Sequence, residues 1–86
     1  MVLTLTETDG VELVHRSAGE LPIAQLTAPR AMPRGVRAWG IRYRDSSHPE
    51  QPFSGPFNAA KKTREKALAD VEWVVRVCSD HQLGLA

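Results

Sequence analysis

The nine residues VRAWGIRYR at positions 36–44 decide the fold that this sequence predicts. Side chains alternate along a β-strand, which divides this run into two faces. One face contains Arg37, Trp39, Ile41 and Tyr43. The opposite face contains Val36, Ala38, Gly40, Arg42 and Arg44. A two-residue period with large apolar side chains on one side predicts a strand that packs on a core through that side.

The segment before this strand predicts a β-hairpin over residues 2–16. Two short runs rich in apolar and β-branched residues flank Asp9 and Gly10, and Asp-Gly between such runs is a hairpin signal. Residues 21–26 are a candidate for a third extended stretch. Pro22 would restrict that stretch to an edge strand or to a first-strand position.

The segments next to the 36–44 strand are expected to be a loop and a returning strand. Prolines and glycine predict a loop over residues 29–35. Residues 45–49 predict a turn, and residues 51–57 are expected to return as a partner strand whose phenylalanines pack beside the first strand's aromatic rings. Two prolines and a glycine in that segment indicate a strand that is short, bent or at an edge.

The last third of the chain predicts an amphipathic helix. Apolar residues recur at three- and four-residue steps: Ala60, Ala67, Leu68, Val71, Val74, Val75 and Cys78. Asn58 and Thr63 are candidate N-caps, Gly84 follows the end, and residues 63–82 form the best-defined part. We therefore expect a single α+β domain over residues 1–86: an antiparallel sheet of three to five strands, including the N-terminal hairpin, packed on one C-terminal helix.

Length and composition bound the class of protein. Eighty-six residues suffice for one core, and 42% hydrophobic with 24% charged residues is typical of a folded globular chain. Cys78 is the lone cysteine, which favours a reducing compartment. No apolar run approaches the roughly 20 residues of a membrane-spanning helix. We expect a soluble, cytoplasmic protein with no membrane partner.

Signatures of catalysis and metal binding are missing from the sequence. It contains no glycine-rich phosphate loop, no paired histidines on one helix turn and no Cys/His cluster with ligand spacing. His15, His48 and His81 are far apart in sequence and are interpreted as structural or solvent-exposed, and Cys78 as a small buried hydrophobic residue. We expect a non-enzymatic protein with no metal site, no cofactor and no small-molecule substrate.

Charge is unevenly distributed along the chain. Residues 1–28 carry one base and four acids, residues 29–66 nine bases and three acids, and residues 67–86 one base and three acids. The segment charges are −3, +6 and −2, and a basic segment of this kind attracts phosphate. Candidate nucleic-acid contacts are Arg30, Arg34, Arg37, Arg42, Arg44, Lys61, Lys62 and Arg64. The alternative is a solvated strand face that is rich in arginine.

Three features between residues 39 and 67 carry a family resemblance. They are a Trp-x-Ile-Arg-Tyr-Arg-Asp strand at 39–45, Gly55-Pro56-Phe57 after a polar turn, and Thr-Arg-Glu-Lys-Ala at 63–67 at the start of a helix. This stretch, about a third of the chain, resembles the arm-site DNA-binding domain of tyrosine-type phage integrases. The resemblance implies a three-stranded antiparallel sheet on one helix, with the open sheet face on DNA and Arg42 and Arg44 as the contacts. It favours a binding module of bacterial or phage type.

Trp73 and Val77 indicate a second possible binding surface. On a helical wheel they lie nearly opposite the stripe that contains Val71 and Val74. Either the N-terminal hairpin wraps around to cover them, or another chain does. The alternative function is therefore a protein-interaction protein, an inhibitor or adaptor or a homodimer, that uses the outer helix face around Trp73.

Overall fold

Over the residues that the structure describes, the chain folds as five antiparallel strands followed by one helix. The computed structural model describes residues 2–9, 11–31 and 37–85. The elements are β1 (Thr4–Thr8), β2 (Val11–His15), β3 (Pro22–Ala31), β4 (Arg37–Tyr43), β5 (Ala59–Lys61) and α1 (Arg64–Val77). The strands pair in chain order, β1-β2-β3-β4-β5, so each strand lies beside its neighbour in sequence. The predicted α+β class, with a small antiparallel sheet and one C-terminal helix, is confirmed.

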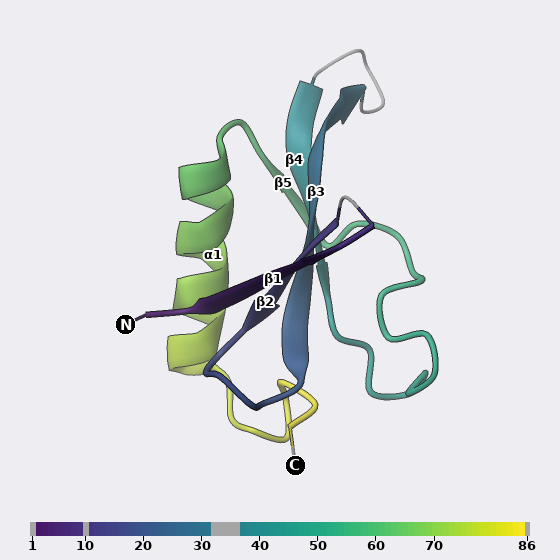
Figure 1. The fold of residues 1–86 in the computed structure, drawn as a ribbon, viewed down its shortest axis with the longest axis vertical. Helices are drawn as coiled ribbons and strands as arrows, with labels where there is room; N and C mark the ends of the chain where they lie inside the picture. Colours follow the sequence, from purple (N-terminus) through teal and green to yellow (C-terminus); the bar gives the residue numbers. More distant parts are fainter. Residues whose placement is uncertain (1, 10, 32–36, 86) are drawn as a thin grey trace.

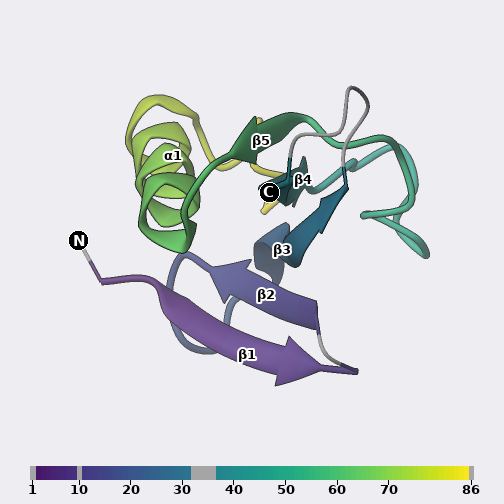
Figure 2. The same cartoon turned by 90° about the horizontal axis from the view of Figure 1, so that it is seen from above.

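Helix α1 covers one face of the sheet (Figures 1 and 2). Its buried side chains are Ala67, Val71 and Val75. They share a core with Val14, Ala24, Leu26 and Ile41 of the central strands, while Trp39 and Tyr43 are partly buried against it. Because side chains alternate, the neighbouring residues Leu13, Gln25 and Arg42, which pair across β2, β3 and β4, project from the opposite face. The predicted apolar face of the central strand is the one that meets the helix.

The N-terminal hairpin is confirmed and belongs to the same sheet. Thr8 pairs with Val11, and Asp9 between them has a φ of 53°, a left-handed conformation that aspartate adopts more readily than most residues. β2 then pairs with β3, which places the hairpin next to the central strands.

β3 is longer and more central than the sequence predicted. It extends to Ala31 and lies between β2 and β4, so residues 29–31 of the loop predicted over 29–35 belong to this strand, and residues 32–35 lie outside the described residues. Pro22 occupies the first position, where a strand tolerates proline. The β3–β4 register shifts between Thr27 and Arg30, and such an irregularity accommodates a proline that has no N–H for the ladder.

The returning strand predicted at residues 51–57 is wrong. Residues 45–58 form a loop of turns and bends, because Pro52, Gly55 and Pro56 interrupt regular pairing. The strand that pairs with β4 is instead β5, three residues long. Ala60, assigned to the helical stripe, lies in this strand and is exposed.

Of the two candidate caps, Thr63 and not Asn58 starts the helix, which ends earlier than predicted. Thr63 is the N-cap, and its side chain accepts a hydrogen bond of 3.1 Å from the backbone N–H of Lys66. The helix stops at Val77, and the chain then turns through residues 79–84 to bury Leu83 against the core. Gly84 has a φ of 75°, so the left-handed residue ends this turn and not the helix itself.

Candidate nucleic-acid interface

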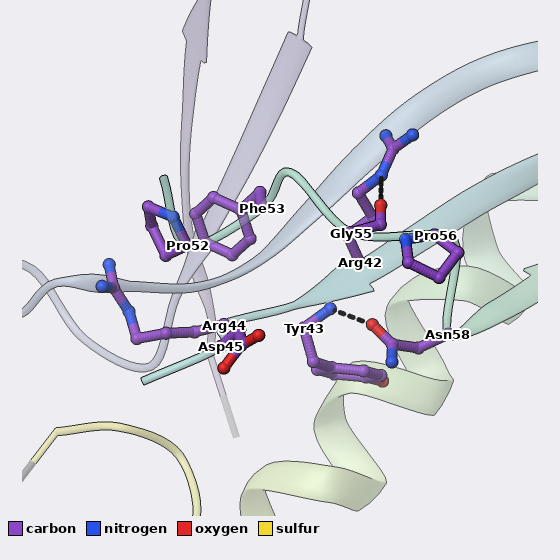
Figure 3. Close-up of a pocket in the computed structure, with 9 residues that line it drawn as sticks. All are labelled: Arg42, Tyr43, Arg44, Asp45, Pro52, Phe53, Gly55, Pro56 and Asn58. Carbon is purple, nitrogen blue, oxygen red and sulfur yellow. Dashed lines mark hydrogen bonds between the residues drawn. The ribbon is translucent and has the colours of Figure 1, made fainter. Parts of the chain in front are cut away.

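The end of β4 and the loop after it enclose a hollow of about 280 Å³ on the face of the sheet opposite α1 (Figure 3). Its lining residues are Arg42, Tyr43, Arg44, Asp45, Pro52, Phe53, Gly55, Pro56 and Asn58. Backbone hydrogen bonds fix the loop at both ends: the Asp45 N–H donates to the Pro52 carbonyl at 2.9 Å, and the Asn58 N–H donates to the Ile41 carbonyl at 2.8 Å. The hollow is therefore bounded by an anchored loop.

Arg42 holds this loop against the sheet. Its Nε donates to the Gly55 carbonyl at 2.8 Å and its Nη1 donates to Oε1 of Gln25 at 3.0 Å. The guanidinium carbon also lies 3.9 Å from the centre of the Phe57 ring, within the range of a cation–π contact. Arg42 thus has a structural role besides any role in binding.

Arg44 is the less committed of the two arginines. Its Nε donates to the Pro22 carbonyl at 2.7 Å, and its guanidinium carbon lies 5.5 Å from the centre of the Phe53 ring. Burial lowers the pKa of Arg44 below its ordinary value, because desolvation disfavours the charged form. Within the described part of the chain, no carboxylate forms an ion pair with Arg44.

Asp45 is the acidic residue of the lining. Its Oδ1 accepts hydrogen bonds from the Ser47 N–H at 3.0 Å and from the Ser47 hydroxyl at 2.5 Å, and its Oδ2 lies 3.0 Å from Nδ1 of His48. The hydrogen bonds from Ser47, followed by the one from His48, lower the pKa of Asp45. Its carboxylate is therefore directed into the 45–48 turn.

Gly40 and Phe57 make the closest contact between loop and sheet. A Cβ atom on Gly40 would lie 2.3 Å from Cε1 of Phe57, closer than carbon atoms can approach. The ring therefore lies directly on the backbone of β4, at a place where any side chain would displace it. The space that glycine leaves on this face of the strand is thus filled by the chain's own loop.

The other predicted basic contacts are dispersed. Arg64 pairs with Glu12 at 2.6 Å and Lys61 with Asp70 at 3.7 Å, both between helix and sheet. Arg37 is exposed, lies on the face of β4 that is directed towards the helix, and donates a hydrogen bond of 3.2 Å to the Pro29 carbonyl. Lys62 follows β5 and is also exposed. Arg30 lies in β3 opposite Ala38, and Arg34 lies outside the described residues. Among the predicted contacts, the hollow brings together Arg42 and Arg44.

Trp73 and Val77 are exposed on the outer face of α1, with 61% and 55% of their surface accessible. The hairpin pairs with β3 and does not cover them, so the hypothesis that it wraps around the helix is wrong. An uncovered tryptophan remains one helical turn from an uncovered valine.

Of the nine residues that line the hollow, seven were not predicted as site residues, and three of them show why. Phe53 and Gly55 lie in a segment that was assigned to a strand, and Asn58, considered as a helix cap, instead accepts a hydrogen bond of 2.7 Å from the Tyr43 N–H. The Pro-Gly-Pro spacing between residues 52 and 56 was the available signal, since it is more typical of a loop than of a strand.

Comparison with models of known protein families, with curated proteins and with solved structures finds no match to this chain. In the residue ranges that the structure describes, no helix has both the length and the apolar character needed to cross a membrane. The similarity of residues 39–67 to integrase arm-site domains therefore stays a prediction that rests on the sequence pattern.

Proposed function

We propose that this chain is a non-enzymatic nucleic-acid-binding module of bacterial or phage type that acts in the cytoplasm. The observation that carries the proposal is the pair Arg42 and Arg44, which line one hollow on the face of the sheet that α1 leaves uncovered. Each guanidinium has an aromatic ring nearby and donates from Nε to a backbone carbonyl.

Desolvation supports a phosphate as the group that is bound. The Arg44 guanidinium is half-buried and has no acidic partner among the described residues, so desolvation disfavours its charged form. An anion that enters the hollow would compensate for the lost hydration of this charge. Arginine suits this task because its planar fork matches the geometry of phosphate oxygens. The +6 charge of residues 29–66 would attract the polyanion to this side of the molecule.

Fluorescence anisotropy with labelled oligonucleotides of mixed sequence tests the proposal. Binding should weaken steeply as salt rises from about 50 to 200 mM, because neutralised phosphates release counterions. Arg44→Ala should weaken binding at least fivefold, whereas Arg76→Ala, which removes one exposed charge from the helix on the other side of the sheet, should change it little. Equal losses from both substitutions would contradict a site at the hollow.

Protein interaction through the outer face of α1 is the second candidate function, favoured by the exposure of Trp73 and Val77. A second copy of the chain suits this face. If two helices pack antiparallel about Trp73, Val77 lies opposite the exposed Ala69 of the second copy. Apolar positions then match.

Analytical ultracentrifugation over a range of concentrations tests this second candidate. A 14-residue helix is only about 21 Å long, so the interface is small and a weak dimer is expected. Trp73→Ala should abolish the dimer and leave the unfolding free energy of the monomer within about 0.5 kcal/mol, since the side chain is mostly exposed. A protein that stays monomeric at millimolar concentration would contradict self-association.

A further inference from the structure

We infer that the hollow beside β4 binds a single strand of nucleic acid in preference to a duplex. The inference rests on the proposed function and specifies its substrate class. It comes from the position of the 45–58 loop, which lies on the side of the sheet that would otherwise be free to approach a double helix (Figure 2).

A sheet that reads duplex DNA inserts its exposed strands into the major groove, so its open face has to project from the molecule. Here the Phe57 ring lies on β4 at Gly40, and the Gly55 carbonyl is bonded to Arg42. The loop therefore stands between the strand backbone and any duplex. Insertion of β4 into a groove would require the loss of the contacts that Arg42 makes with Gly55 and Phe57.

The dimensions of the hollow fit one nucleotide unit. Its volume of about 280 Å³ lies just below the range of about 300–1,000 Å³ that is usual for small-ligand pockets. A phosphate and the adjoining sugar or base of a flexible strand can enter a space of this size. A duplex can also present a phosphate, but its bases are paired and stacked, so only a single strand can present an unpaired base to the hollow.

The chemistry of the lining also fits an unpaired base. Proteins that bind single strands combine positive charge along the backbone with aromatic side chains on which bases stack. Arg44 provides the charge and Phe53 provides a planar apolar wall in the same hollow (Figure 3). The Asp45 carboxylate is engaged by Ser47 and His48. Arg44 has no carboxylate partner among the described residues, so its guanidinium is the charge available to an entering phosphate.

The test compares a labelled single-stranded oligonucleotide of mixed sequence with its duplex, at one low salt concentration, by anisotropy. We expect the single strand to bind at least tenfold more tightly. Phe53→Leu, which keeps apolar volume but removes the flat ring, should weaken single-strand binding at least fivefold, and Phe53→Tyr, which keeps the ring, should retain it. Leu21→Ala serves as the control, because Leu21 is an exposed apolar residue that does not line the hollow. Circular dichroism establishes that each variant is folded.

The outcomes separate this inference from the function on which it rests. If duplex binds as tightly as the single strand and Arg44→Ala weakens both, the inference is overturned and the proposed function stands. If neither form binds at low salt, both are overturned. Single-strand binding that is equally strong in Phe53→Leu and in the wild type would also refute the inference, because it would place the strand elsewhere.

Discussion

The substitution Gly40→Ala tests how tightly the 45–58 loop is bound to the sheet. The added Cβ would lie 2.3, 2.6 and 2.8 Å from three atoms of the Phe57 ring. Carbon atoms in favourable contact are about 3.5 Å apart, so the ring has to move by about 1.2 Å. That movement alters the contact of Phe57 with the Arg42 guanidinium, which now lies 3.9 Å from the ring centre.

Two opposing effects set the magnitude. Forcing a methyl group into a filled contact destabilises a protein by about 1–3 kcal/mol, and replacing glycine by alanine in a strand stabilises it by about 0.5–1 kcal/mol. We expect a net loss of about 1–2 kcal/mol in the free energy of unfolding. The same methyl group should be harmless once the ring is absent, so Gly40→Ala added to Phe57→Ala should produce no further loss.

Urea denaturation followed by circular dichroism measures these values. Gly55→Ala is the matched control, because its added Cβ would have no heavy atom within 4 Å and Gly55 is exposed in the same loop. An unfolding free energy for Gly40→Ala within about 0.5 kcal/mol of the wild type would refute the contact. Additive losses in the double variant would refute its assignment to Phe57, since residues in contact should couple.

Three further predictions concern the helix cap and two titrating groups. Thr63→Ala removes the hydroxyl that accepts the Lys66 N–H and should lower the unfolding free energy by about 1 kcal/mol, whereas Thr63→Ser should not; equal losses would exclude the cap. Hydrogen bonds from Arg16 and then Ser17 lower the pKa of Glu20 to about 2 from an ordinary 4.5. The stability that the ionised carboxylate contributes is therefore present above pH 4.5 and is lost as pH falls towards 2. The melting temperature of Glu20→Gln should depend less on pH in that window than the melting temperature of the wild type, and an equal dependence in both proteins would contradict the ion pair. Burial, and then the hydrogen bond to Asp70, raises the pKa of Tyr43 above its ordinary 10.0, so the tyrosine of the unfolded chain ionises first as pH rises. The unfolding free energy should therefore fall above pH 10 in the wild type but not in Tyr43→Phe, and a wild type whose stability is constant above pH 10 would contradict this. At neutral pH, Tyr43→Phe should be about 1–2 kcal/mol less stable than the wild type, because it lacks the hydrogen bond.

The fold was predictable where a strong period coincided with local turn chemistry. The alternation through Trp39, Ile41 and Tyr43 identified the strand and its core face, and Asp9-Gly10 identified the first hairpin. Element ends were less predictable, because they depend on tertiary contacts. Pro29 is accommodated in β3 by a register shift, which a count of loop-forming residues cannot foresee.

The end of the helix shows the same limit. Apolar periodicity continues to Cys78, but Leu83 is buried by a turn after the helix and not by the helix itself. Arg16 pairs with both Glu20 and Asp80, which ties the β2–β3 turn to this C-terminal segment across 64 residues. No local sequence pattern encodes a contact between residues so far apart.

Arg42 and Arg44 show why a site is harder to predict than a strand. Both follow from one alternating pattern, yet the partners that distinguish them are backbone carbonyls, of Gly55 and of Pro22, which no sequence pattern marks as acceptors.

Loss of Arg42 removes the attachment of the loop together with a charge, so its effect on binding is inseparable from its effect on the hollow. The Arg44 side chain has one hydrogen bond to the backbone and no acidic partner within the described residues, so a change at this position comes closest to altering charge alone. If nucleic acid binds here, the dependence of affinity on salt should therefore become shallower in Arg44→Ala, because one phosphate contact is lost. In Arg42→Ala the affinity should fall and the stability of the loop should fall with it.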